Sequence, residues 1–148
     1  MLAVGRGREP HLDALFADYA RRCPWPIRLV EVQPRATLAP DRRKEAEAAL
    51  LLAAVPAGAA IVALDERGGD HGSVELARRL GAWREQGRRC AAFLIGGADG
   101  LAEAALAMAE LRLAFGRQTW PHRLVRVMLA EQLYRATTIL AGHPYHRS

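Results

Sequence analysis

The chain has 148 residues, of which 51% are hydrophobic and 25% charged, which is typical of one folded domain and excludes a disordered segment. It contains no run of about 18 apolar residues, which excludes a membrane helix, and its N-terminus lacks the apolar stretch of a signal peptide, so we expect a cytoplasmic protein. The net charge of +5 favours an anionic partner, although a GC-rich genome alone also produces arginine-rich chains.

The N-terminal stretch predicts a strand, a helix and a second strand. Residues 2–4 form a strand stub that is short for a core strand, which favours a clipped or misassigned start. Four apolar residues then recur at helical spacing, at Leu12, Leu15, Phe16 and Tyr19. Pro24 ends this helix, and the apolar residues of 27–32 predict the second strand.

The next stretch predicts a helix, a buried strand and a loop. Asp41 can cap a helix with a basic first turn, and Pro56 ends it. The continuous apolar run 59–64 is typical of a parallel strand that is buried on both faces. Residues 65–72 are rich in glycine and charge and predict a loop.

A third helix and another buried strand follow. Ser73 can cap the helix and Gly87 can end it, and its large apolar residues at helical spacing read as core: Leu76, Leu80 and Trp83. Residues 89–95 predict a strand, and Cys90 should enter the core there. Cys90 and Cys23 fit neither a disulfide framework nor a zinc spacing, so we interpret both as reduced structural thiols.

The C-terminal third predicts a short helix, a strand and a long helix. Residues 101–110 are alanine-rich, and residues 111–115 alternate as in a strand. Pro121 suits the first position of the last helix, and Gly142 suits the left-handed residue that closes it. This helix is apolar on more than one face, so it needs a second packing partner such as another subunit.

Strand and helix alternate five times, which predicts one α/β domain over residues 1–148 with a mostly parallel sheet. Ligands of such sheets bind beyond the carboxyl ends of the strands, here after Leu64, at Gly96-Gly97 and at Gly116. The two glycines alone are a weak signal, because a bare turn explains them better than a ligand site does. They do not form G-x-G-x-x-G, which disfavours a nicotinamide site.

The C-terminal tail is rich in groups that hydrogen-bond, stack or titrate: His143, Tyr145, His146 and Arg147. Short tails are usually frayed and inert, which is the alternative interpretation. Pro144 lies between the two histidines and prevents their alignment on a helix, so we expect no metal site. Basic residues that could contact phosphates, or could simply be solvated, are Arg6, Arg8, Arg21, Arg22, Arg42, Arg43 and Lys44.

Three segments taken together resemble the RlmH family of SPOUT-superfamily methyltransferases, which modify N3 of a pseudouridine in 23S ribosomal RNA. They are residues 93–101, with the glycine turn, residues 120–135, with PHRLVRVMLAEQLYR, and residues 143–147, with HPYHR. The resemblance covers nearly the whole chain. One departure is Ala98-Asp99, where the family usually has Pro-Glu.

The resemblance implies a Rossmann-like sheet whose C-terminal part, about residues 60–148, threads a trefoil knot, a rare exception to the rule against knots. It also implies S-adenosylmethionine (SAM) in the knot and an obligate homodimer packed through the last helix. By the family pattern SAM contacts Leu64, the glycine turn and the loop that follows the last strand. The residues concerned are Leu64, Gly96, Gly97, Phe115, Gly116, Arg117, Gln118, Thr119 and Trp120.

The same resemblance gives the tail a chemical role. The N3 proton of pseudouridine must leave before N3 can attack a methyl group, so the site needs a base or an arrangement of groups that stabilises the anion. A neutral His143 or His146 could take the proton, Arg147 could hold an oxygen, and Tyr145 could stack on the base. We expect the substrate to be the assembled 70S ribosome, contacted by both subunits, rather than naked 23S rRNA.

Two other functions remain open. An assembly factor that kept the fold and lost methyl transfer is supported only by Ala98-Asp99. An unrelated small-molecule α/β enzyme would need a catalytic constellation that the sequence does not contain.

Overall fold

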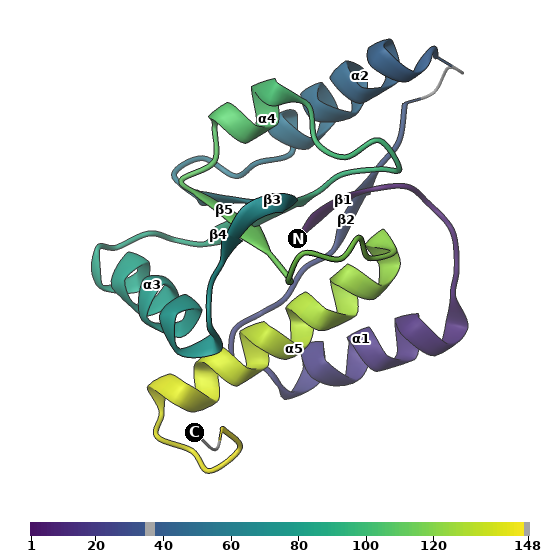
Figure 1. Ribbon diagram of the computed structural model, residues 1–148. Helices are drawn as coiled ribbons and strands as arrows, with labels where there is room; N and C mark the ends of the chain where they lie inside the picture. The colour runs from purple at the N-terminus through teal and green to yellow at the C-terminus, as the bar shows by residue number, and fades with distance from the viewer. Residues whose placement is uncertain (35–37, 147–148) are drawn as a thin grey trace.

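The computed structural model describes residues 1–34 and 38–146, which build a five-stranded parallel sheet with helices on both faces (Figure 1). The strand order is β2-β1-β4-β3-β5, and every neighbouring pair is parallel. The predicted α/β class is therefore confirmed. In chain order the elements are β1 (Leu2–Val4), α1 (Pro10–Arg22), β2 (Val30–Val32), α2 (Pro40–Ala53), β3 (Ala60–Asp70), α3 (Ser73–Glu85), β4 (Ala91–Ile95), α4 (Glu103–Ala107), β5 (Leu111–Ala114) and α5 (His122–Leu140).

The sheet separates two apolar layers, with α2 and α4 on one face and α1, α3 and α5 on the other (Figure 1). Successive strand residues point to opposite faces, so Val62 packs in the layer of α3 and α5 while Ile61 and Ala63 pack in the layer of α2 and α4. This two-sided burial explains why the strand at 59–64 is apolar without alternation. The predicted stripe of α3 is buried as expected, at Leu76, Leu80 and Trp83.

Helix α5 lies between α1 and α3 and is packed on several sides within one chain (Figure 1). Leu129, Ala130 and Ala136 are fully buried, and only Leu140 at its end is an exposed large apolar residue of the helix. Leu124 and Met128 of the same helix are only half-buried and belong to neither apolar layer, so part of its apolar surface has no partner within the described chain. A second subunit therefore stays a prediction. No helix in the described part of the chain is long and apolar enough to cross a membrane.

The predicted helix starts are wrong by one or two residues. Pro40, not Asp41, begins α2, because its fixed φ suits the first helical position, and Asp41 lies in the first turn. Gly72 precedes α3, and the hydroxyl of Ser73 donates instead to Gln132 Oε1 of α5 at 2.7 Å. Pro121 is the N-cap residue of α5, one position before the first helical residue that was predicted for it. Gly142 adopts the expected left-handed φ of +64°.

The predicted loop at 65–72 is mostly strand, because β3 continues to Asp70 after an irregularity in its pairing with β5. Both Leu64 and Gly69 are in register with Leu113, so the intervening residues form a bulge. A Cβ on Gly68 would lie 2.8 Å from the carbonyl carbon of Arg112. Glycine therefore lets β3 approach β5 at this edge and is not a sign of a loop here.

Two further predictions differ from the structure. Helix α4 covers only Glu103–Ala107 of the predicted 101–110. Strand β4 begins at Ala91, so Cys90 is exposed rather than in the core, whereas Cys23 is buried. Both cysteines are free thiols, as expected.

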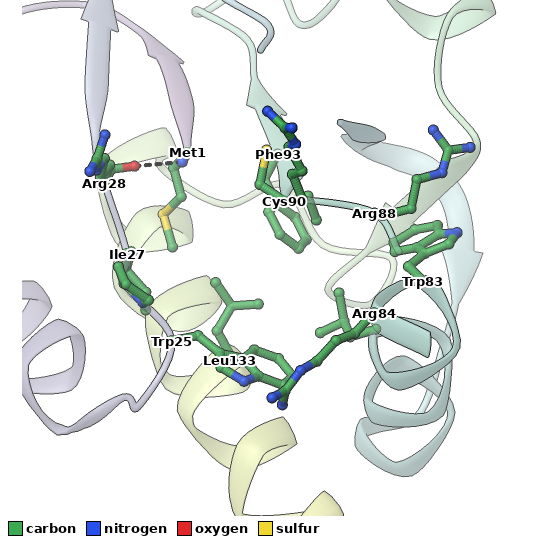
Figure 2. Close-up of a pocket in the computed structure, with 14 residues that line it drawn as sticks. Met1, Trp25, Ile27, Arg28, Trp83, Arg84, Arg88, Cys90, Phe93 and Leu133 are labelled. Atoms are coloured by element: carbon green, nitrogen blue, oxygen red, sulfur yellow. Dashed lines mark hydrogen bonds between the residues drawn. The ribbon is translucent and has the colours of Figure 1, made fainter. Parts of the chain in front are cut away.

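A cavity lies at the amino ends of the strands (Figure 2). Strand β1 pairs with β4 only at Leu94 and Ile95, whereas β3 pairs with β4 over its whole length. The volume of this cavity is about 450 Å³, and Trp25, Trp83 and Phe93 line it beside Met1. It lies at the sheet edge opposite the loops that follow the strands.

Candidate active site

Register places the three predicted cofactor segments side by side at the carboxyl edge of the sheet. Leu64 of β3 is in register with Ile95 of β4 on one side and with Leu113 of β5 on the other. The glycine turn follows Ile95 directly, and the loop 115–120 follows β5. The structure therefore brings Leu64, the turn and the loop together.

The glycine turn is shaped mainly by contacts within the protein. The amide of Gly100 donates to the carbonyl of Gly97 at 3.1 Å. A Cβ on Gly96 would lie 2.6 Å from the carbonyl carbon of Gly100, so the turn can close only with glycine at this position. Gly100 itself has φ +76° and no atom within 4 Å of its missing Cβ, which leaves the backbone open on that side.

Helix α2 holds this turn through an ion pair. Arg43 donates from Nε to Asp99 Oδ2 at 3.1 Å and also from Nη2 to the same oxygen. Arg43, predicted as a phosphate contact, thus holds the turn instead, and Asp99 keeps a structural role without the Pro-Glu sequence. The two basic residues beside Arg43 were also predicted phosphate contacts: Arg42 is exposed and Lys44 is half-buried.

The loop 115–120 is closed by two side-chain hydrogen bonds. Trp120 Nε1 donates to the carbonyl of Phe115 at 2.9 Å, and Gly116 turns the chain with φ +83°. Thr119 Oγ1 donates to Glu66 Oε2 at 2.8 Å, which ties the loop to the extension of β3. The remaining two predicted contacts, Arg117 and Gln118, are exposed.

His122 begins α5 directly after this loop and is half-buried. Burial lowers its pKa, and the charges of Arg126 and Arg123 lower it further, so the imidazole is neutral at pH 7. A Cβ on Gly5 would lie 3.5 Å from its Nε2. No role was predicted for His122 from the sequence. The Pro-His pair before an arginine-rich helix was the sequence feature that could have identified it as a candidate site residue.

Arg126, one turn further along α5, fastens this helix to the end of β1. Its Nη1 donates to Glu31 Oε1 at 2.7 Å, and its Nη2 donates to the carbonyls of Val4 at 3.0 Å and Gly5 at 3.3 Å. Only 4% of the residue is exposed. This anchor fixes the start of α5, and with it His122, beside the carboxyl edge of the sheet.

The C-terminal tail folds back onto α5 rather than fraying. The hydroxyl of Tyr145 donates to Glu131 Oε1 at 3.1 Å, and its ring meets Tyr134 edge-on with 4.8 Å between centroids. Arg135 donates to the same Glu131 oxygen and lies over the ring of Tyr145, 5.0 Å from its centroid. Arg22 of α1 covers Tyr134 at 4.5 Å.

The tail and the loops do not meet within one chain, because they lie toward opposite ends of α5 (Figure 1). Tyr145 reaches back only to Glu131, which is about 14 Å along the helix from His122 at 1.5 Å per residue. His143 Nδ1 accepts from the amide of Tyr145 at 3.1 Å, and Nδ1 of His146 is buried without a partner. Arg147 lies outside the described residues.

Tyr145 is held as a hydrogen-bond donor, not as a base. Burial and the charge of Glu131 raise its pKa to about 12, so the phenol stays protonated through neutral and mildly alkaline pH. Tyr145→Phe should weaken tail docking by about 1.5–3 kcal/mol, the usual worth of a hydrogen bond to a charged group. We expect the variant to slow the reaction at the candidate site without changing the shape of its pH profile between pH 6 and 10. An alkaline limb that disappears in Tyr145→Phe would contradict this assignment.

The remaining predicted phosphate contacts fall at two places. Arg6 and Arg8 are exposed in the segment that follows β1, at the same sheet edge as the loops. Arg21 and Arg22 end α1 beside the tail, and both pair with Asp18. The basic residues therefore flank both halves of the candidate site.

Comparison with known proteins gives matches over the full chain. A family model described as a predicted SPOUT methyltransferase matches residues 1–146. The protein named ribosomal RNA large subunit methyltransferase H of Rhodospirillum centenum is 57% identical over 148 residues, covering 100% of this chain and 97% of that protein. Its namesake in Paramagnetospirillum magneticum is 54% identical over 145 residues (98% and 95% covered), and that in Rhodospirillum rubrum is 53% identical over 146 (99% and 96%).

Proposed function

Since this chain belongs to the SPOUT methyltransferases, and among them to the ribosomal RNA large subunit methyltransferase H family, we propose that it transfers the methyl group of SAM to N3 of a pseudouridine in 23S rRNA. Full-length identity of 57% to a protein of that name carries the proposal. The three loops that converge at one sheet edge support it, because such edges are where parallel α/β sheets bind ligands.

The residues at this edge fit SAM. Leu64 offers an apolar surface, the turn offers open backbone at Gly100, and Trp120 offers an aromatic ring that is 39% exposed. We therefore assign the cofactor to Leu64, the glycine turn and the loop 115–120. When bound, SAM supplies an electrophilic methyl on its sulfonium, and the protein supplies orientation. The family also implies that the chain threads a trefoil knot through this region.

The base that removes the N3 proton belongs to the tail in this proposal. His146 is the first candidate, because its buried Nδ1 makes no hydrogen bond within the described part of the chain, and His143 is its alternative. His122 is a third imidazole, already neutral and next to the loops. Comparing His146→Ala, His143→Ala and His122→Ala for kcat, with SAM affinity measured separately, identifies which of them takes the proton.

The tail serves the loops of a second chain, because within one chain it reaches only to Glu131. This geometry makes the site incomplete in a monomer and favours a homodimer packed through α5. Two exposed apolar residues of the helices on this face of the sheet, Leu15 of α1 and Leu140 of α5, are available for such an interface. The dimer would join the loops of one subunit to the tail of the other.

The proposed substrate is the 70S ribosome in the cytoplasm. One small domain with scattered arginines can neutralise phosphates but has few groups that could read a base sequence, so an assembled surface supplies the selectivity. Arg6, Arg8, Arg21 and Arg22 flank the site and are the proposed phosphate contacts.

Transfer of labelled methyl from SAM tests the proposal, with 70S ribosomes that lack the modification and naked 23S rRNA in parallel. We expect label at N3 of one pseudouridine in the ribosome sample alone. Equal label in naked rRNA would contradict ribosome recognition. No label in either sample, with SAM binding and dimerisation verified, would favour an inactive assembly factor.

A further inference from the structure

Glu47 of α2 is a buried carboxyl group that lies against the glycine turn. Only 7% of the residue is exposed, and its Oε2 has no hydrogen-bond partner among residues 1–34 and 38–146. A Cβ on Gly97 would lie 2.9 Å from Oε2 and 3.2 Å from Oε1, so the carboxyl occupies the space that a side chain at 97 would need. A side chain at 97 would therefore have to displace the carboxyl group of Glu47.

The packing of α2 does not explain an acid at this position. Ala48 and Leu51 of the same helix are apolar and buried in the layer that α2 shares with α4. An alanine or leucine would fill the place without leaving a polar atom unpaired, whereas a buried carboxyl without a partner destabilises the fold. A group that destabilises the fold next to a candidate cofactor turn calls for a role at that turn.

Glu47 and Arg43 lie four residues apart, so they project from one face of α2. Arg43 holds Asp99, and Glu47 contacts Gly97, so α2 fixes the turn at two points. The end of β1 borders the same space, because Val4 Cγ1 lies 3.1 Å from the missing Cβ of Gly97. The charged groups that act on Glu47 are Arg43 and Asp99.

We propose that Glu47 is a positioning residue of the methyltransferase: its neutral carboxyl keeps the glycine turn in the shape that binds SAM, and its ionisation disturbs that shape. The part that concerns SAM rests on the function proposed above. The link between the carboxyl and the turn stands on the geometry alone.

The sign of the effect follows from the surroundings of the carboxyl. Burial raises the pKa of Glu47, Asp99 raises it further, and Arg43 lowers it. An acid whose pKa is raised in the folded state favours its neutral form there. The support it gives to the turn is therefore complete at low pH and is lost as the pH rises through the raised pKa.

The test measures SAM affinity by calorimetry from pH 5 to pH 8.5 for the wild-type protein, Glu47→Gln, Glu47→Ala and Glu45→Gln. Wild-type affinity should fall as pH rises, and the neutral isostere Glu47→Gln should hold high affinity across the range. Glu47→Ala should bind about tenfold more weakly at every pH, the scale of one lost positioning contact. Glu45 is exposed on the same helix, so Glu45→Gln should match the wild type and serves as the matched control.

A second readout does not need SAM. The amide resonances of Gly97 and Gly100 should titrate in wild-type protein between pH 5 and pH 8.5, and this titration should be absent in Glu47→Gln. An identical titration in both proteins, or loss of affinity in Glu47→Gln as large as in Glu47→Ala, overturns the inference. If no variant binds SAM, the proposed function fails, and the amide titration still decides the role of Glu47.

Discussion

Two variants that are each inactive alone, Gly96→Ala and His146→Ala, should recover methyl transfer when they are combined in mixed dimers. In Gly96→Ala the new Cβ would lie 2.6 Å from the carbonyl carbon of Gly100, and backbone cannot move aside as a side chain can. The turn must open, so SAM binding should be lost. In His146→Ala the turn is intact, and the loss of a general base should slow transfer by about 10²–10⁴-fold.

Recovery follows if each site takes its tail from the other subunit. In a mixed dimer, the loops of the His146→Ala chain are intact and meet the intact tail of the Gly96→Ala chain, so one of two sites is complete. Random pairing yields half mixed dimers, and the sample should regain about a quarter of wild-type activity. Two affinity tags on co-expressed chains allow the mixed dimer to be isolated and assayed on ribosomes.

The control pairs Gly96→Ala with a chain that carries both substitutions, and this pair has no complete site in either arrangement. It should stay inactive, which excludes wild-type contamination. An isolated mixed dimer of Gly96→Ala and His146→Ala without activity would contradict the shared site, because it would mean that each tail acts within its own chain.

Arg126→Ala should produce the largest loss of stability. The guanidinium is 4% exposed and holds the carboxylate of Glu31 as well as two carbonyls at the end of β1. Removing it leaves these oxygens without their donor, and breaking a buried pair in this way costs about 3–5 kcal/mol. Folded domains have only about 5–15 kcal/mol in total, so the variant should be close to unfolding at 37 °C.

Urea unfolding of Arg126→Ala, Arg126→Lys and Glu31→Gln separates the contributions. Lysine keeps the charge near Glu31 but lacks the fork that reaches both carbonyls, so its loss should be intermediate. Glu31 is 32% exposed, and Glu31→Gln should cost least. A loss of under about 1 kcal/mol in Arg126→Ala would contradict the anchor.

Strands and core faces were predictable wherever hydrophobic pattern alone determines them. The uninterrupted apolar run at 59–64 is the first half of β3, buried on both faces, and Trp83 lies in the core as its spacing indicated. The extension of β3 was missed because Gly68 and Gly69 read as a turn. Gly68 instead allows β3 to approach β5 closely, a contact between distant segments that no local sequence pattern records.

The candidate site, too, was predictable in part from the sequence. The sheet rule and the family resemblance both selected Leu64, the glycine turn and the loop 115–120, and register places these together. Glu47 was missed because an acidic residue that follows three cations, Arg42, Arg43 and Lys44, is typical of a solvated helix face. Its spacing four residues before Leu51 was the one signal that it belongs to the buried face. The docking of the tail on α5 depends on Arg22, more than a hundred residues earlier in the chain.

Helix α5 has a consequence for the order in which the protein is made and folded. It supplies Leu129, Ala130 and Leu133 to the apolar layer that also contains residues of β1 and α3, so this layer cannot be completed before α5 is made. All five strands precede α5 in the chain, so they emerge from the ribosome before the helix that covers them. During synthesis this face of the sheet is therefore an exposed apolar surface for chaperones to cover.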